Sequence, residues 1–313
     1  MSDAPVLPIS LVIVSDFEPG PKTWQDEDEC LRRSMADPQG VPAQVVIAAA
    51  SADADAKRPD WSDLGVPIEV VFVDSTYSGT IKNAATAHVT EELVAVVEAD
   101  CVAEPGWLQA LYRTYLEDTT LDAVTGLTSY APTSAMRRVT GLYDRGYLTQ
   151  TFANGDAAHI SNNGALYKKS VLEAFPYDDD PSPFVSGHKR HNAMRAAGIR
   201  VGLARDAFQY HAYGGWPFIV DVRMNKGHQH EIMEEGRSAP AASKRGDARW
   251  AANTVWAGLS ADYRLLRRAF GTFCRPLDLP LALIFPLLVR GLELRGARAA
   301  RRGLSAVPGT SYR

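Results

Sequence analysis

The sequence has little cysteine and no secretory signal. Only Cys30, Cys101 and Cys274 occur among 313 residues, and none has the spacing of a metal-binding pair. A disulfide framework is therefore excluded, and this use of cysteine fits a reducing compartment. The first ten residues, MSDAPVLPIS, lack both the basic segment and the apolar run of a signal peptide. We therefore expect a cytoplasmic protein.

Long hydrophobic runs are also missing. The most apolar stretch, LDLPLALIFPLLV at 277–289, contains two prolines. It is shorter than the roughly 20 residues that a membrane-spanning helix needs, and internal prolines disfavour such a helix. The remaining composition, 46% hydrophobic and 22% charged, is ordinary for a globular protein. A chain of 313 residues has room for one large domain or two small ones.

Positive charge is scarce in the body of the chain and concentrated in its tail. Residues 237–313 contain 14 Lys and Arg against 4 Asp and Glu, although the whole chain has a net charge of −4. An acidic body indicates an acidic site, and a basic tail indicates an anionic partner surface. Two interpretations of the tail stay open: a peripheral position on the inner face of an anionic membrane, or a packed helical hairpin that covers the body or joins subunits into a homo-oligomer. No nucleic-acid partner is expected.

Apolar strands alternate with helices in the first 130 residues. The pattern predicts strands at 9–14, 43–50, 68–73, 93–101 and 121–130. It predicts helices over 24–36, within 79–90 and after Pro105. Strands that alternate with helices favour an α/β fold with a mostly parallel central sheet, whose ligands lie beyond the carboxyl ends of the strands. The alternation fades after residue 131, where we expect a helix over 134–155 and another that ends at Gly198.

Acidic side chains stand where several of these strands end. Glu98 and Asp100 follow the buried strand LVAVV, and Asp16 and Asp74 follow two others. If the chain stays extended through residue 100, Glu98 and Asp100 lie on the same side. Two carboxylates held close repel each other, and a divalent cation with oxygen ligands is the simplest reason for the arrangement. The alternative is a strand that runs out into solvent, or acids that cap helices.

The order and spacing of five segments resemble those of the family-two inverting glycosyltransferases of GT-A fold, over roughly residues 9–230. The segments are ISLVIVSDF, SGTIKNAA, LVAVVEADCVAEPGWLQAL, NNGALYKKSVLEA and FVSGHKRHNAMRAAGIRV. The third contains the family's Asp-any-Asp motif with Glu in the first position. The resemblance implies a nucleotide-diphosphate-sugar donor, Mn²⁺ or Mg²⁺ as cofactor, and a sugar or lipid-linked acceptor in polysaccharide or glycoconjugate biosynthesis.

The resemblance also implies roles for individual residues. Asp100 and His211 would hold the metal ion. The donor would be bound by Asp16, Lys82, Asn83, Glu98 and Asp100. The acceptor would be bound by Asn163, Gly187 and Trp216. Four of these residues also have a purely structural explanation. Lys82 could be a solvated helix residue, His211 a packed core histidine, Asn163 a turn residue and Trp216 part of the core.

The sequence departs from the family where the catalytic base is expected. The family usually has Glu-Asp after the acceptor-side glycine, whereas this chain has Gly187-His188-Lys189. His188 is one candidate base, because an imidazole has an ordinary pKa near 6.5. Asp179, with its neighbours in the loop 178–180, is the other. A third alternative is that the chain has no base and transfers nothing. The strand at 43–50 also lacks the acid that often ends it in the family.

We therefore expect a GT-A-like catalytic domain over 1–230, with a donor half over about 1–130 and an acceptor half over about 131–230. A basic, helical region follows over 231–313. The expected activity is metal-assisted sugar transfer with inversion. The alternatives are a catalytically impaired nucleotide-sugar-binding partner, or a nucleotidyltransferase of similar topology. The latter would need a glycine-rich basic loop after the first strand, and SDFEPGPK is not one.

Overall fold

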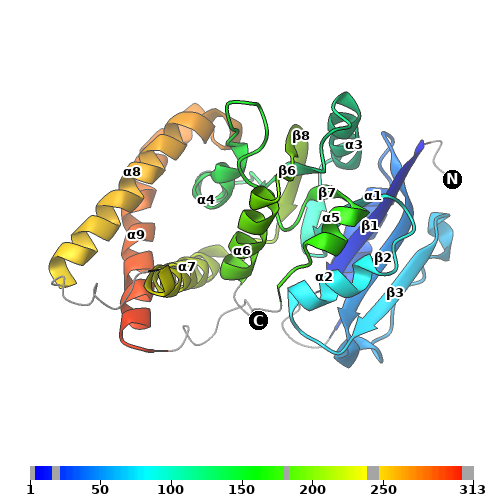
Figure 1. Ribbon diagram of the computed structural model, residues 1–313, viewed down its shortest axis with the longest axis horizontal. Helices are drawn as coiled ribbons and strands as arrows, with labels where there is room; N and C mark the ends of the chain where they lie inside the picture. The colour runs from blue at the N-terminus through cyan, green and yellow to red at the C-terminus, as the bar shows by residue number, and fades with distance from the viewer. Residues whose placement is uncertain (1–3, 16–21, 179–182, 238–246, 305–313) are drawn as a thin grey trace. The chain divides into compact units, whose positions relative to one another are not determined.

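A computed structural model describes residues 4–15, 22–178, 183–237 and 247–304. The chain divides into two compact units. The first comprises Met1–Ser129 and Leu148–Ala212, and the second comprises Tyr130–Tyr147 and Tyr213–Tyr312. The first is built on a sheet and the second on helices (Figure 1).

The first unit contains an eight-stranded sheet in the order β3-β2-β1-β4-β7-β6-β8-β5. Its parallel part consists of β1 (Val6–Ser15), β2 (Val41–Ala50), β3 (Ile68–Val73) and β4 (Leu93–Glu98). Its other strands are β5 (Cys101–Ala103), β6 (Ala123–Tyr130), β7 (Ala165–Lys168) and β8 (Val201–His211). β7 runs antiparallel to β4 and β6, and β5 runs antiparallel to β8. The predicted α/β class is confirmed, with an antiparallel extension of the parallel part.

Helices cover both faces of the parallel strands. They are α1 (Gln25–Met35), α2 (Ser78–Thr86), α3 (Trp107–Glu117), α5 (Lys169–Ala174) and α6 (Pro183–Ala196). On β1, Leu11 and Ile13 pack in a core with Leu31 of α1, whereas Val12 and Val14 pack in a second core with Ile81 of α2. Because β1 is buried on both faces, its sequence is apolar at consecutive positions. Short 3₁₀ helices occur at Ser51–Asp53, Ser62–Leu64, Gly146–Thr149 and Pro276–Asp278.

Two predicted elements are wrong in extent. The strand expected over 93–101 stops at Glu98, and residues 99–100 form a turn before β5. Ala99 N donates to Val14 O of β1 at 2.9 Å, and Ala212 N, just after β8, donates to Asp100 O at 3.0 Å. The two residues of the turn therefore bond to different parts of the sheet. The helix expected over 134–155 is α4 (Ala135–Arg145), followed by the 3₁₀ turn at Gly146–Thr149.

The second unit consists of α4 with three long helices: α7 (Gly215–Arg237), α8 (Asp247–Phe273) and α9 (Leu279–Arg301). The prediction of a helical C-terminal region is confirmed. α7 and α9 approach closely at two glycines: a Cβ on Gly227 would lie 2.0 Å from Glu293 O, and one on Gly296 would lie 1.9 Å from Met224 O. Within the described residues, we find no helix with the length and apolar content to span a bilayer.

Buried charges lie among these four helices. Arg223 of α7 is fully buried and pairs with Asp144 of α4 and, at 2.8 Å, with Glu293 of α9. Arg290 pairs with Glu293 and, at 2.6 Å, with Asp262 of α8. We call Asp144, Arg223, Lys226, Asp262, Arg290 and Glu293 the helical charge network. Its cations and anions are equal in number.

Candidate functional site

Acidic and imidazole side chains meet at the carboxyl end of β4. Glu98 is the last residue of β4, Asp100 lies in the following turn, and Cys101 begins β5. His211 ends β8 and is the register partner of Cys101 across the antiparallel pair. The pairing of a three-residue strand with the end of β8 therefore brings His211 to the two acids, although it is more than 100 positions away in the sequence. We call Glu98, Asp100 and His211 the acid cluster.

The imidazole of His211 lies between the two carboxylates. Its Nε2 is 3.6 Å from Glu98 Oε2, and its Nδ1 is 3.4 Å from Asp100 Oδ2. Nδ1 also lies 3.0 Å from the carbonyl oxygen of Ala212, which accepts a hydrogen bond from that nitrogen in the tautomer protonated at Nδ1. That tautomer leaves the lone pair of Nε2 for a ligand, as in metal-binding histidines whose other nitrogen donates to a carbonyl.

The acid cluster has the donor set and the spacing of a divalent-cation site. One ligand atom from each of Glu98, Asp100, Cys101 and His211 can be chosen so that all lie within 4.8 Å of one another. Ligands bound about 2.0–2.6 Å from one ion have separations in this range. The side chains of Glu98, Asp100 and His211 are only 11–18% exposed. Two carboxylates and an imidazole fit Mn²⁺ or Mg²⁺ by the chemistry of their donor atoms.

Lys82 of α2 supplies a cation to this site. Its Nζ lies 2.7 Å from Glu98 Oε1, and its side chain is 4% exposed. Burial acts to raise the pKa of Glu98, but the charges of Lys82 and His211 outweigh that effect and hold the pKa well below its usual range. Glu98 is therefore an ionised carboxylate, and one of its oxygens accepts a hydrogen bond from Lys82.

Asn163 holds the other oxygen of Glu98. Its Nδ2 donates to Glu98 Oε2 at 2.5 Å and approaches Cys101 Sγ at 3.4 Å. Ser161 Oγ donates to Asn163 Oδ1 at 3.0 Å, which fixes the amide with its nitrogen toward the acid. The next residue, Gly164, has φ +78°, and a Cβ there would lie 2.2 Å from Gln209 Nε2. A glycine is therefore required beside the asparagine that orients Glu98.

Other predicted site residues have different surroundings. Asn83 bonds the backbone of Tyr177 twice, donating to Tyr177 O and accepting from Tyr177 N at 2.8 Å each. Gly187 lies on α6, where a Cβ would be 2.3 Å from Asn162 Nδ2. Trp216 lies on α7 in the second unit and is 47% exposed. Asp16 and Asp179 lie outside the described residues, and of His188 only the backbone, within α6, is described.

Cys101, Tyr177 and Arg190 were not predicted as neighbours of the site. Cys101 is fully buried, and its Sγ lies 3.7 Å from Asp100 Oδ1. The ring of Tyr177 contacts two cations, with Lys82 Nζ 5.4 Å and Arg190 Cζ 4.1 Å from its centroid. Burial raises the pKa of Tyr177 well above its usual value, so it stays a neutral phenol. The position of Cys101 directly after Asp100 was the one available signal in the sequence.

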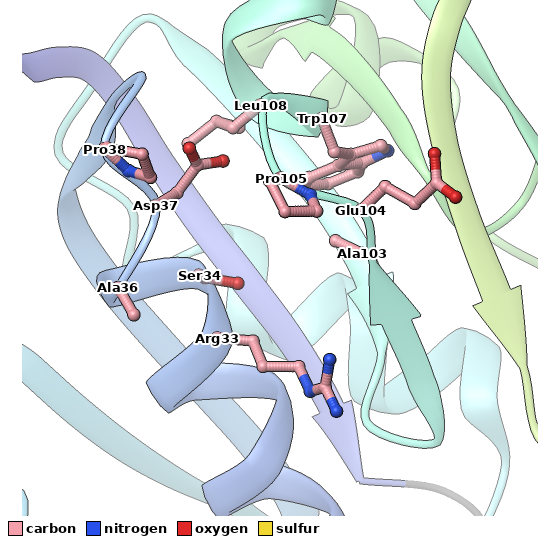
Figure 2. Close-up of a pocket in the computed structure, with 10 residues that line it drawn as sticks. All are labelled: Arg33, Ser34, Ala36, Asp37, Pro38, Ala103, Glu104, Pro105, Trp107 and Leu108. Carbon is pink, nitrogen blue, oxygen red and sulfur yellow. The ribbon is translucent and has the colours of Figure 1, made fainter.

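A small pocket in the first unit is separate from the acid cluster. It has a volume of about 190 Å³ and is lined by Arg33, Ser34, Ala36, Asp37, Pro38, Ala103, Glu104, Pro105, Trp107 and Leu108. Figure 2 shows the end of α1 on one side and the β5–α3 connection on the other. Asp37 accepts hydrogen bonds from Gly106 N at 2.6 Å and from Gln39 N at 2.9 Å. Its carboxylate therefore connects the two sides of the pocket.

No family model and no curated protein matches the sequence. Solved structures do match. The mannosyltransferase PcManGT from Pyrobaculum calidifontis, in complex with GDP-Man and Mn²⁺, is 15% identical with a TM-score of 0.54, over 96% of this chain and 90% of that one. Glucosyl-3-phosphoglycerate synthase from Mycobacterium tuberculosis, with Mn²⁺, UDP-glucose and phosphoglyceric acid, is 13% identical with a TM-score of 0.46, over 72% and 78%.

A nucleotidyltransferase is also among the matches. CMP:2-keto-3-deoxy-manno-octonic acid synthetase, complexed with CTP, is 12% identical with a TM-score of 0.41, over 62% of this chain and 88% of that one. Similarity at these identities bears on the fold alone, and the match to the mannosyltransferase has a TM-score above 0.5. The chain therefore shares that enzyme's fold, which confirms the GT-A-type fold predicted from the sequence.

Proposed function

We propose that this protein is a metal-assisted glycosyltransferase that uses a nucleotide-diphosphate-sugar donor and inverts the anomeric centre. The observation that carries the proposal is the acid cluster. Two ionisable acids and an imidazole converge where ligands bind in open α/β sheets, beyond the carboxyl end of a central strand. A solved protein that shares the fold contains GDP-Man and Mn²⁺, which supports the same class of ligand here.

In this proposal Asp100, His211 and Glu98 hold Mn²⁺ or Mg²⁺. When bound, the cation neutralises the negative charge that develops on the departing diphosphate. Lys82 and Asn163 keep Glu98 ionised and aimed at the site through their bonds of 2.7 and 2.5 Å. Asp16 contributes to recognition of the base or ribose, and Asn83 fixes the Tyr177 backbone beside Lys82.

The base that removes the proton from the acceptor hydroxyl is assigned to His188, with Asp179 as the second candidate. Asn163, Gly187 and Trp216 remain proposed for the acceptor side, with a sugar or a lipid-linked sugar as acceptor. For His188→Ala we expect donor binding to be retained and transfer to be lost. Full transfer by that variant would move the role of base to the loop 178–180.

A second candidate function is a nucleotide-sugar-binding protein without transfer activity. The sequence Gly187-His188-Lys189, in place of an acidic pair, favours it. The two candidates agree on donor and metal binding and differ on turnover. A protein that binds donor with metal but releases no nucleoside diphosphate, with any acceptor tried, would support the second.

The test is a thermal-shift panel of nucleoside diphosphates and nucleotide sugars, each with and without Mn²⁺. A ligand that binds only the folded state raises the melting temperature in a concentration-dependent way. We expect at least one nucleotide to give a shift that needs Mn²⁺, and Asp100→Asn to abolish the Mn²⁺-dependent part. Asp206→Asn is the matched control, because its side chain is 78% exposed on β8. An equal shift in wild type and Asp100→Asn would contradict the proposal.

A further inference from the structure

The outer face of α9 carries a group of exposed aliphatic side chains. Leu277 precedes the helix, and the others recur at intervals of four residues along its first half. Each is between 42% and 92% exposed: Leu277, Leu279, Leu283, Ile284, Leu287 and Leu288. Ala282, Phe285 and Val289 are fully buried on the opposite face. Single exposed leucines are ordinary, but a contiguous group marks a surface that is covered in use.

Residues 250–304 around this group carry exposed positive charge and no exposed acid. Between residues 250 and 304, all of which are described, the acidic residues are Asp262, Asp278 and Glu293. Each is buried or nearly so and bonds arginine: Asp262 and Glu293 with Arg290, and Asp278 with Arg138. The exposed arginines of this stretch are Arg264, Arg267, Arg268, Arg275, Arg295, Arg298 and Arg302. Among residues 250–304, each acid is therefore held in such a pair, and the exposed charges of this stretch are positive.

Exposed aromatic side chains accompany the charges on α8. Trp256 is 72% exposed and Tyr263, seven residues later on the same side of the helix, is 56% exposed. α8 and α9 lie side by side, joined through Arg290 and Asp262 (Figure 1). Aliphatic groups, amphipathic aromatics and arginines on one hairpin are the components of a surface that lies in the boundary between lipid headgroups and acyl chains.

We propose that the α8–α9 hairpin, Asp247–Arg301 with Leu304, docks on an anionic lipid bilayer. The α9 leucines enter the headgroup boundary, and the arginines contact lipid phosphates. The alternative occupant, a second copy packed through the same hairpin, would bring two sets of exposed arginines together with no exposed acid from residues 250–304 between them, and such like-charge contact is unfavourable. This inference goes beyond the proposed function and does not depend on it.

Vesicle co-sedimentation of the full chain tests the proposal, with phosphatidylcholine vesicles and vesicles that also contain phosphatidylglycerol. We expect binding to the anionic vesicles, weakened by high salt. Leu283→Ser and Leu287→Ser are each expected to lower the vesicle partition coefficient about tenfold. Leu116→Ser is the matched control, since Leu116 lies on α3 and is 54% exposed. Arg295→Gln and Arg298→Gln are each expected to lower the coefficient about fivefold, and Arg205→Gln is the control.

Two results would overturn the proposal. One is the absence of binding to anionic vesicles, or binding that the leucine variants leave unchanged. The other is a dimer, seen without lipid by sedimentation velocity, that Leu283→Ser abolishes, since the face would then be covered by a second copy. The Mn²⁺-dependent thermal shift is measured on the same samples. The absence of that shift in wild type would contradict the proposed function, whereas vesicle binding tests the docking proposal separately.

Discussion

The two units bury charge in opposite ways. In the helical charge network, Arg223, Lys226 and Arg290 face Asp144, Asp262 and Glu293, so three cations balance three anions. In the acid cluster, Glu98 and Asp100 face Lys82 and His211, whose imidazole nitrogens are also donor atoms for a metal ion. The first set consists of ion pairs between guanidinium and carboxylate groups, whereas the second gathers the donor atoms that a divalent cation takes.

This difference distinguishes a structural ion network from a ligand site. A balanced network satisfies each charge within the protein, and removing a member leaves a buried charge. A cluster of two carboxylates and an imidazole, held by Lys82, Asn163 and the β5–β8 pairing, offers ligands to a cation from outside. The arrangement costs stability in the absence of that cation, because like charges are held close. Three single substitutions test this difference: two in the helical charge network and one beside the acid cluster.

The largest effect is expected for Arg223→Met. The side chain of Arg223 is fully buried, and its loss leaves Asp144 and Glu293 without their shared partner. We expect the free energy of unfolding to fall by about 3–5 kcal/mol, measured by urea denaturation. Adding Mn²⁺ should not restore the lost free energy of unfolding. Arg205→Met, at an exposed position, should change stability by less than about 0.5 kcal/mol. Equal stability of Arg223→Met and wild type would show that the network is not structural.

An intermediate effect is expected for Glu293→Gln. Burial acts to raise the pKa of Glu293, but Lys226, Arg223 and Arg290 outweigh it and lower the pKa below its ordinary value of 4.5. A carboxyl with a depressed pKa contributes stability above its ordinary pKa, and the contribution is lost as the pH falls below that value. We expect Glu293→Gln to lower the free energy of unfolding by about 1–3 kcal/mol at pH 7. The difference from wild type should shrink below about pH 4.5. A difference that does not change with pH would contradict the charge-based account.

A smaller and metal-dependent effect is expected for Lys82→Met. Without its cation, the acid cluster gains one negative charge, while Asn163 and His211 still contact Glu98. Without metal, we expect the free energy of unfolding to fall by about 1 kcal/mol. On adding Mn²⁺, we expect the melting temperature to rise more than it does in wild type. The same addition to Arg223→Met is the control. If Mn²⁺ raises the melting temperature of Lys82→Met no more than that of wild type, the acid cluster does not bind a cation in place of the lost lysine charge.

The sequence was informative about elements and less so about contacts. The strands of the parallel part follow from consecutive apolar residues, as at Val12–Val14 and Val94–Val97, because burial on both faces imposes that pattern. The turn at residues 99–100 was missed, because it depends on bonds to Val14 and Ala212 rather than on local preference. The helix over 134–155 was predicted too long, because Tyr147 continues the apolar spacing of Leu142 and Tyr143 but lies in the 3₁₀ turn that follows α4.

The site could be anticipated only in part for the same reason. Glu98, Asp100 and His211 were singled out by strand ends and by family order, and the structure places them together. The bond from Asn163 to Glu98 joins residues 65 positions apart, and the pairing of Arg223 with Glu293 joins residues 70 apart. Such contacts leave no local pattern in a single sequence. Cys101 was visible beside Asp100, but its burial against Asn163 was not.

The most direct test of the central claim is a calorimetric titration of Mn²⁺ into the full chain in the presence of a nucleoside diphosphate identified by thermal shift. The account predicts one bound ion per chain in wild type and in Arg223→Met where that variant is folded, and none in Asp100→Asn. Binding of the same ion by Asp100→Asn with unchanged affinity, or no binding by wild type, would show that the acid cluster at the end of β4 does not hold a cation.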